Sequence, residues 1–341
     1  MRAALERFAR RTWSGDAGWG GGLAAAALSP VAGAYRLALA AHQWRARGAV
    51  QEVEGLPVIS VGNLAVGGTG KTPVASWLVR HLASEGHRPA LLSRGYGRDE
   101  VLLHRRWTPD ALVLAQPDRV RAARDAQAKG ATVAVLDDGF QHLRLARQLD
   151  IVLLAAEDRF PGPLLPRGPY REPAQALGRA DVLLVTRRAA TQAAADGLRT
   201  ALGQSFPEAV LAQLRLEPRG WLTLAGDAAP DPGSDVLAVS AVARGEAFAR
   251  EVANAVGGGK GRVDALSFPD HHEYSDGDIR EIRRRAKDRT VVVTEKDAVK
   301  LMTFQEALGD VRVLAQGISW EHGLDAVLRR VTDVAPPPET S

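Results

Sequence analysis

From residue 57 onward, short apolar runs rich in β-branched residues alternate with longer stretches in which apolar residues recur at helical spacing. This alternation predicts βαβ units and a parallel sheet, and therefore an α/β fold. Most of the short runs are continuously apolar, as strands buried on both faces require. The predicted strands of this first series are 57–61, 89–93, 132–136, 151–155 and 182–186.

A second βαβ series follows a break in the pattern. Residues 209–224 predict two strands around a Glu-Pro-Arg-Gly turn at 217–220, and the Ala/Asp/Pro/Gly-rich stretch after them is typical of a linker. The predicted strands of the second series are 236–240, 263–268, 290–294 and 311–315, and its helices lie near 246–256, 276–287 and 324–331. We therefore expect an N-terminal segment over 1–45, a first α/β domain over 46–217, a linker over 218–234, a smaller C-terminal α/β domain over 235–334 and a disordered tail over 335–341.

Composition narrows the class of protein. The chain has 341 residues, 45% of them hydrophobic, which is enough to bury the cores of two domains. It has no cysteine, which excludes a disulfide-stapled scaffold and a cysteine-ligated metal centre. Lysine and arginine number 44 against 40 acids, and only six of the 44 are lysines. No basic patch interleaved with aromatic residues is visible, so we expect no nucleic-acid partner.

The N-terminal segment over 1–45 has the apolar and polar pattern of a helix that lies on a membrane surface. Its apolar residues over 23–44 are interrupted by Arg36 and His42, as in a helix that lies in a lipid headgroup layer without crossing the bilayer. The alternative is a helix that packs on the protein's own core. Asp16 and a run of glycines separate the basic start from the apolar part, which disfavours a signal peptide. We therefore expect a cytoplasmic protein that begins at Met1.

The strongest chemical signal is a glycine-rich loop. Residues 60–72 follow the strand over 57–61 and precede a helix, which is the setting of a phosphate-binding loop for a nucleotide such as ATP. Lys71 can reach the β- and γ-phosphate oxygens, and the Thr72 hydroxyl can ligate Mg²⁺. Ala65 stands where the usual pattern has glycine, so an ordinary glycine-rich turn is the alternative. The predicted nucleotide-binding residues are Gly67, Gly68, Thr69, Gly70, Lys71 and Thr72.

Two acids end the buried strand over 132–136. A carboxylate in this position can hold Mg²⁺ beside a phosphate-binding loop, and we predict that Asp137 is on the metal side. Asp138 either holds the metal directly or orients a neighbouring group, and the spacing does not separate these two roles. Without the loop nearby, the two acids would be read as ordinary turn formers.

A regulatory ATPase or GTPase is the runner-up. The loop also resembles that of membrane-associated dimeric ATPases, although these have a second lysine where this chain has Val66. Residues 294–297, Thr-Glu-Lys-Asp, either help to hold a nucleobase or form a helix N-cap with charged residues in its first turn. A structural adaptor with a degenerate loop is a third possibility, which the intact Lys71, Thr72 and paired acids disfavour.

Several motifs together are more specific than the loop alone. In order and in kind they resemble the tetraacyldisaccharide 4′-kinase family, the lipid A 4′-kinases, over about residues 20–332. The motifs are the loop at 60–73, Ser-Arg-Gly-Tyr-Gly-Arg at 93–98, Asp-Asp-Gly-Phe-Gln-His at 137–142, Leu-Pro-Arg-Gly-Pro-Tyr-Arg-Glu-Pro at 165–173, Phe-Pro-Asp-His-His at 268–272 and Thr-Glu-Lys-Asp at 294–297.

The resemblance implies a P-loop NTPase-like first domain and a smaller second α/β/α domain, with the active site in the cleft between them. It also implies Mg²⁺- and ATP-dependent transfer of the γ-phosphoryl group to the 4′-hydroxyl of an acylated glucosamine disaccharide. The implied partners are this lipid and a membrane surface, and the implied location is the cytoplasmic face of the bacterial inner membrane.

The resemblance also assigns roles to single residues. It implies that Asp99 is the catalytic base, although this chain is shorter than the family after residue 98, which leaves Asp110 as the alternative. His271 is implied as the partner of the base, and Arg119 and Arg171 are implied near the phosphates. Guanidinium groups suit phosphate oxygens because their planar fork binds two at once. Tyr170 replaces the usual leucine and either packs or touches substrate.

Overall fold

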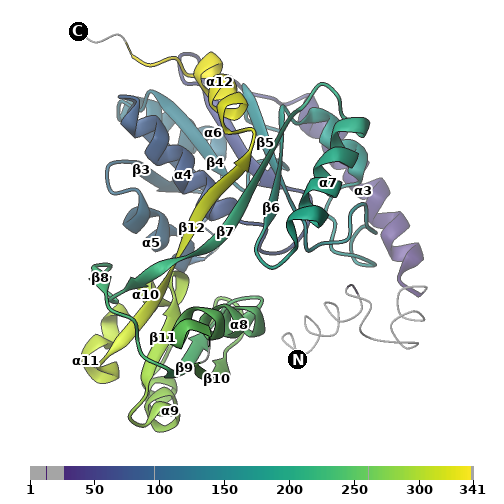
Figure 1. The fold of residues 1–341 in the computed structure, drawn as a ribbon. Coiled ribbons are helices and arrows are strands. Elements are labelled where there is room, and N and C mark those ends of the chain that lie inside the picture. The colour runs from purple at the N-terminus through teal and green to yellow at the C-terminus, as the bar shows by residue number, and fades with distance from the viewer. Residues whose placement is uncertain (1–12, 14–26, 96, 260, 339–341) are drawn as a thin grey trace. The chain divides into compact units, whose positions relative to one another are not determined.

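The computed structural model describes residues 13, 27–95, 97–259 and 261–338, and its chain divides into two compact units (Figure 1). The larger unit draws on 1–94, 108–215 and 319–341, and the smaller unit on 95–107 and 216–318. The two long strands β7 (Val210–Leu222) and β12 (Val311–His322) each contribute residues to both units. An α/β fold is confirmed, because parallel sheets with helices form both units.

A parallel sheet forms the centre of the larger unit, with strand order β7-β6-β5-β1-β4-β2-β3. The strands β1, β2, β4 and β5 are buried along their whole length, as their continuous apolar runs predicted. Only β3, at the edge and partly exposed, was not predicted. The strands are β1 (Val58–Asn63), β2 (Pro89–Ser93), β3 (Leu112–Ala115), β4 (Val133–Asp137), β5 (Leu149–Ala155) and β6 (Val182–Arg187).

Helices on the sheet connect these strands. Helix α4 (Lys71–Ser84) packs against β1, β2 and β4 through its buried apolar face. The other helices of this unit are α6 (Arg119–Ala128), the 3₁₀ helix η1 (Ala174–Arg179), α7 (Gln192–Ser205) and α12 (Leu324–Val334). Because β1 runs directly into the glycine-rich loop and α4, the loop lies at the carboxyl edge of the sheet, next to the end of β4.

The N-terminal helix α3 (Ser29–Arg47) confirms helical structure within the segment predicted over 1–45. Residues 1–12 and 14–26 of that segment lie outside the described residues. Leu37 and Trp44 of α3 are 75% and 77% exposed. Among the described residues, no helix combines the length and the apolar character that crossing a bilayer requires.

The smaller unit holds a parallel sheet in the order β10-β9-β11-β12. Helix α8 packs on β9 and β10, and the short helix α10 packs on both α5 and β11. Its elements before β12 are α5 (Arg98–Trp107), β8 (Ala228–Ala229), β9 (Asp235–Ser240), α8 (Gly245–Ala255), η2 (Val256–Gly259), β10 (Arg262–Ser267), α9 (Asp276–Ala286), β11 (Thr290–Thr294), α10 (Glu295–Leu301), η3 (Met302–Phe304) and α11 (Gln305–Leu308).

The predicted turn at 217–220 was wrong, because β7 continues through it. The Arg219 side chain lies against Gly317, where a Cβ atom would collide with it, and the guanidinium donates to the Ile318 carbonyl oxygen at 2.6 Å. These contacts hold the Pro-Arg-Gly sequence in an extended strand. The predicted linker over 218–234 also contains structure, since β8 pairs antiparallel with the end of β7.

The two units differ from the predicted domains in three other places. Residues 95–107 come before most of the first sheet in the sequence but belong to the smaller unit, and residues 319–338 belong to the larger unit. The tail predicted as disordered from 335 begins with a buried residue, because Ala335 is 4% exposed and its carbonyl oxygen lies 3.2 Å from His87 Nε2. Contacts between distant segments set these boundaries, and composition shifts do not reveal them.

Candidate active site

The glycine-rich loop has the backbone geometry of an anion site. Gly70 is the N-cap of α4 and has a left-handed conformation with φ of 94°, and Gly67 has φ of 139°. Both conformations favour glycine, which explains these two positions of the motif. Lys71 is the first residue of α4, so the free N–H groups of its first turn and the positive end of its dipole lie at the loop.

Lys71 is held by groups from two neighbouring strand ends. Its Nζ donates to Asn63 Oδ1 at 3.2 Å and lies 3.5 Å from Asp138 Oδ1. Asn63 is fully buried at the end of β1, and its Nδ2 donates to Thr69 Oγ1 at 2.9 Å. Asn63 therefore joins the loop to its lysine, a role that the sequence analysis did not assign.

The two acids after β4 have different partners. The Thr72 hydroxyl donates to Asp137 Oδ2 at 3.3 Å. Asp138 Oδ1 and Oδ2 each accept from Arg171 Nη1 at 3.0 Å. Burial raises the pKa of Asp138, but the charges of Lys71 and Arg171 outweigh it and lower the pKa below its usual value. Asp138 is thus an ionised carboxylate with two cations, while Asp137 faces the hydroxyl of the loop.

The donor set of Thr72 and Asp137 fits Mg²⁺. Both supply hard oxygen ligands, and they lie close enough to hydrogen-bond. The described residues contain no group of three or more His, Cys, Asp or Glu side chains that could hold a metal ion. Mg²⁺ usually keeps several waters and takes one or two protein ligands together with phosphate oxygens.

Arg171 and Arg119 both lie near these acids but differ in environment. Arg171 Nη1 also donates to Gln141 Oε1 at 3.1 Å, so the guanidinium joins two residues of the 137–142 motif. Arg119 is 3% exposed, and its Nη1 donates to the Gln116 carbonyl oxygen at 2.6 Å. Burial and the charge of Arg94 lower the pKa of Arg119 to about 10, so it stays cationic at neutral pH.

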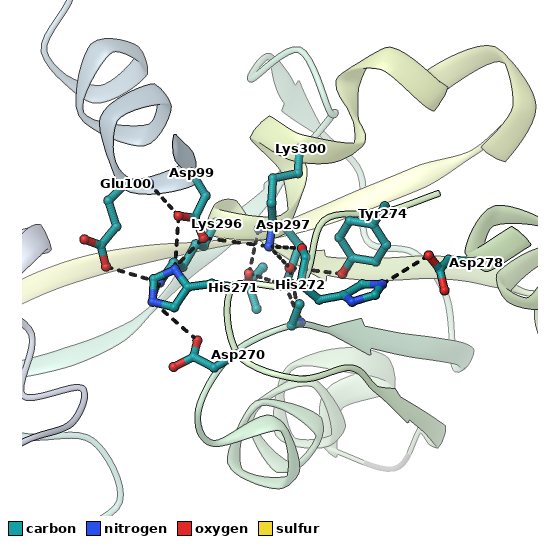
Figure 2. Close-up of polar contacts among 12 residues, drawn as sticks. Asp99, Glu100, Asp270, His271, His272, Tyr274, Asp278, Lys296, Asp297 and Lys300 are labelled. Carbon is teal, nitrogen blue, oxygen red and sulfur yellow. Dashed lines mark hydrogen bonds and ion pairs between the residues drawn. The ribbon is translucent and has the colours of Figure 1, made fainter. Parts of the chain in front are cut away.

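The predicted base and its partner meet within the smaller unit. Asp99, in the first turn of α5, is 2% exposed, and its Oδ1 lies 3.2 Å from Nδ1 of His271 (Figure 2). Asp99 Oδ1 also accepts from the backbone N–H of Glu100 at 3.0 Å. Gly97 is required nearby, because a Cβ atom there would collide with both side chains of the pair. His271 itself has φ of 59°, a conformation that few non-glycine residues adopt.

The surroundings of Asp99 keep it ionised. Burial raises the pKa of Asp99, but the hydrogen bond with His271 and the charges of Lys296 and Lys300 lower it to about 2. The same hydrogen bond raises the pKa of His271 above its usual value, although burial and Lys296 oppose the rise. Lys296 and Lys300 were not assigned as site residues from the sequence. Their four-residue spacing within α10 was the signal that could have indicated a shared face.

The structure shows the surroundings of three groups whose roles the sequence left open. Residues 294–297 form a helix N-cap, since the Thr294 hydroxyl accepts from the Asp297 N–H at 3.0 Å. Tyr170 packs, being 5% exposed with its hydroxyl bonded to the Arg159 carbonyl oxygen. Asp110 is exposed in the turn before β3, and the structure groups it with the larger unit, apart from His271.

Comparisons with known proteins place these features in context. Residues 24–333 match the family described as Tetraacyldisaccharide-1-P 4′-kinase. A tetraacyldisaccharide 4′-kinase of Anaeromyxobacter sp. (strain K) is 39% identical over 323 residues, which cover 83% of this chain and 84% of the relative. One of Alkalilimnicola ehrlichii is 39% identical over 269 residues, covering 72% and 73% of the two chains. A crystal structure of LpxK from Aquifex aeolicus in complex with ATP matches with a TM-score of 0.72 and 26% identity, covering 91% of this chain and 99% of that one.

Proposed function

Because the chain belongs to the tetraacyldisaccharide 4′-kinase family, we propose that its larger unit binds Mg-ATP and that its smaller unit supplies the base for the acceptor hydroxyl. The family membership confirms the resemblance seen in the motifs. The protein is an ATP-dependent phosphotransferase that acts on the 4′-hydroxyl of a tetraacylated glucosamine disaccharide 1-phosphate in lipid A biosynthesis. This reaction needs one group of residues that holds the nucleotide and another that removes the proton of the acceptor hydroxyl.

The loop and its lysine support the assignment of the nucleotide site. The backbone N–H groups at the start of α4 would hold phosphate oxygens, and Lys71 would neutralise charge on the β- and γ-phosphates. Thr72 and Asp137 would hold Mg²⁺, which when bound offsets the negative charge that develops on the transferred group. Asp138 would orient Lys71 and Arg171, because both cations already contact its carboxylate.

The base would work from the smaller unit. An alkyl hydroxyl is a poor nucleophile at neutral pH, so a carboxylate must accept its proton as the bond to phosphorus forms. Asp99 would accept that proton and His271 would orient it, since the two are hydrogen-bonded at 3.2 Å. Arg119 and Arg171 would stabilise phosphate charge from the larger unit. The Asp99–His271 pair in a chain with an intact loop is the observation that carries this proposal.

A direct phosphotransfer assay tests the proposed function. The protein is incubated with labelled ATP, Mg²⁺ and the acylated disaccharide 1-phosphate, and the lipid fraction is examined for a new phosphoryl group. We expect labelled lipid from the wild type and at least about 10²-fold less from Asp99→Asn. The runner-up, an ATPase or GTPase that switches a partner, predicts nucleotide turnover that needs no added acceptor. Equal turnover with and without the disaccharide would favour that alternative.

The exposed face of α3 bears on where in the cell the protein acts. We infer peripheral association with the cytoplasmic face of the bacterial inner membrane, because α3 divides its faces between the protein and solvent. Tyr35 donates to the Arg171 carbonyl oxygen at 2.9 Å, and Gln43 donates to Glu172 at 2.6 Å. Leu37 lies about 200° around the helix from Tyr35. It shares an exposed face with Trp44, one heptad further on.

Point variants test this better than a deletion of residues 1–40, which would also remove Tyr35. We expect the double variant Leu37→Ser/Trp44→Ser to sediment several-fold less with vesicles of anionic phospholipid than the wild type. Val50→Ser is the matched control, because Val50 is 50% exposed but lies outside α3. Equal sedimentation of all three proteins would mean that this face of α3 does not bind membranes.

A further inference from the structure

Two lysines of one short helix converge on the carboxylate of Asp99. Lys296 and Lys300 are four residues apart on α10, and each Nζ lies 3.7 Å from Asp99 Oδ2 (Figure 2). We propose that Lys300 and Lys296 are positioning residues that keep Asp99 ionised and fix the turn that carries His271. This inference rests on the proposed role of Asp99 as the base.

Lys300 joins three segments of the smaller unit. Its side chain is 3% exposed, and its Nζ donates to the His272 carbonyl oxygen at 2.9 Å. The same ammonium lies 3.3 Å from Asp297 Oδ1. One buried cation thus connects α5 through Asp99, α10 through Asp297 and the turn 270–272 through its backbone. Moving the ammonium would release the turn and the carboxylate together.

Asp297 does not account for the position of Lys300 by itself. Asp297 is fully buried and accepts from the Ala241 N–H at 3.1 Å and from the Tyr274 hydroxyl at 3.0 Å. The Thr294 hydroxyl adds a third hydrogen bond at 2.7 Å. These neutral donors already make hydrogen bonds to much of the Asp297 carboxylate. If Lys300 served only to pair with Asp297, its ammonium would not need to reach Asp99, a second buried acid. The contact with Asp99 is the part that the fold of α10 does not explain.

Lys296 acts on the other member of the pair. Its Nζ lies 3.4 Å from Nε2 of His271 and 3.2 Å from Glu100 Oε1. An ammonium can only donate and an ionised carboxylate can only accept, so neutral His271 carries its proton on Nδ1, toward Asp99, and accepts at Nε2. Lys296 therefore selects the tautomer that hydrogen-bonds to the base. Its side chain is 19% exposed, which leaves room for substitution.

The charges around Asp99 predict a measurable pH effect. Its own helix contributes Glu100, the turn contributes Asp270 and His271, and α10 contributes the two lysines and Asp297. Among these groups, the two lysines bring positive charge to within 3.7 Å of Asp99 Oδ2. Loss of one cation near a carboxylate raises the pKa of that carboxylate, typically by about one unit or more. The acid limb of the kcat profile should therefore move to higher pH.

The experiment compares Lys300→Met, Lys296→Met and Lys296→Arg with the wild type. Both Met variants should lower kcat about tenfold or more. They should change the KM for ATP less than about twofold and should raise the acid limb by about one pH unit. Lys296→Arg should restore the acid limb because it keeps the charge. Lys287→Met is the control, since Lys287 is an exposed lysine of the same unit.

The outcomes separate this inference from the proposal beneath it. If Asp99→Asn is inactive but the Met variants keep the wild-type acid limb, the lysines are structural only and the inference is overturned. If Asp99→Asn is fully active, the proposed base is wrong, and the inference falls with it. If Lys300→Met loses its folded circular dichroism spectrum, Lys296→Met and its arginine rescue decide the question alone.

Discussion

Asp138 in the larger unit and Asp99 in the smaller unit each lie near two cations, and the two acids differ in their access to solvent. The Asp138 side chain is 40% exposed and pairs with Lys71 and Arg171. Asp99 is 2% exposed and lies near two lysines of α10. Water competes well for exposed ion pairs, so the cations at Asp138 can turn to phosphate oxygens at little cost. Asp99 has little water to exchange for its partners, so the charges around it lower its pKa and keep it ionised in the free protein.

The two sites also share an unfavourable backbone conformation that the surrounding contacts must hold. Asp138 has φ of 56° and His271 has φ of 59°, and both are non-glycine residues in the left-handed region. Such a conformation costs on the order of 1 to 3 kcal/mol and persists only where the surroundings hold it. At Asp138 the holding contacts come from side chains of Lys71 and Arg171. At His271 they come from Asp99 and from the backbone contact of the turn with Lys300.

The largest expected effect is at Asp99 and its partner His271. Asp99→Asn and His271→Ala should each lower kcat, Asp99→Asn by about 10²- to 10⁴-fold, because a positioned base contributes a factor of that size. The KM for ATP should hardly change, since the loop is in the other unit. The double variant should fall little below the worse single variant, because residues that act together are not additive. Initial rates with the disaccharide acceptor measure all three.

Asp110, the alternative base, provides the control for the variants of Asp99 and His271. Asp110→Asn should keep nearly wild-type rates, because Asp110 lies in an exposed turn of the larger unit. Full activity of Asp99→Asn together with loss of activity in Asp110→Asn would reverse the assignment of the base.

In the glycine-rich loop of the larger unit, Lys71→Ala should lower turnover about 10²-fold or more, as loss of one preorganised charge typically does. It should also weaken ATP binding, which Asp99→Asn should leave intact. Isothermal titration with a non-hydrolysable ATP analogue distinguishes the two variants. Lys129→Ala, which removes an exposed lysine at the end of α6, should change neither quantity. Near-wild-type turnover of Lys71→Ala would contradict the assignment of the loop.

Substitution of Asp137 and of Asp138 should change the Mg²⁺ requirement of the reaction to different degrees. Asp137→Asn should raise the Mg²⁺ concentration for half-maximal rate by about tenfold or more, since it weakens an oxygen ligand paired with Thr72. Asp138→Asn should lower kcat with a smaller change in the Mg²⁺ requirement, because Asp138 contacts the cations Lys71 and Arg171. Rates over a series of Mg²⁺ concentrations test this. The reverse pattern would make Asp138 the metal ligand.

The smallest effect concerns stability and pH. The pKa of Asp99 is lowered to about 2 from its ordinary 3.8, so its ionised form stabilises the folded state. This contribution, about 2 kcal/mol, is present above about pH 5 and is lost as the pH falls toward 2. The difference in free energy of unfolding between wild type and Asp99→Asn should therefore shrink between pH 7 and pH 3 in urea titrations. A constant difference would mean that the charge of Asp99 does not stabilise the fold.

Local chemistry let the sequence predict most of the strands and the nucleotide loop. The apolar runs gave β1, β2, β4, β5 and β6 nearly to the residue, because strands buried on both faces need unbroken apolar sequence. The edge strand β3 was missed because edge strands carry less of this signal. The loop could be found because its glycines and Lys71 are contiguous, and the ends of neighbouring parallel strands bring Asp137 to it.

Only the tertiary structure brought the buried acid and its partners together. Asp99 and His271 are 172 positions apart, and the intervening sheet of the larger unit gives no pattern that pairs them. The family resemblance implied that pair, and its motif at 294–297 contains Lys296, but it gave neither Lys296 nor Lys300 a role beside Asp99. Their charges reach Asp99 because residues 95–107 leave the first sheet and pack on α10, a long-range contact. Sequence therefore determined most of the strands and the contiguous loop, while side chains from separate segments obtained their pKa values and partners only from packing.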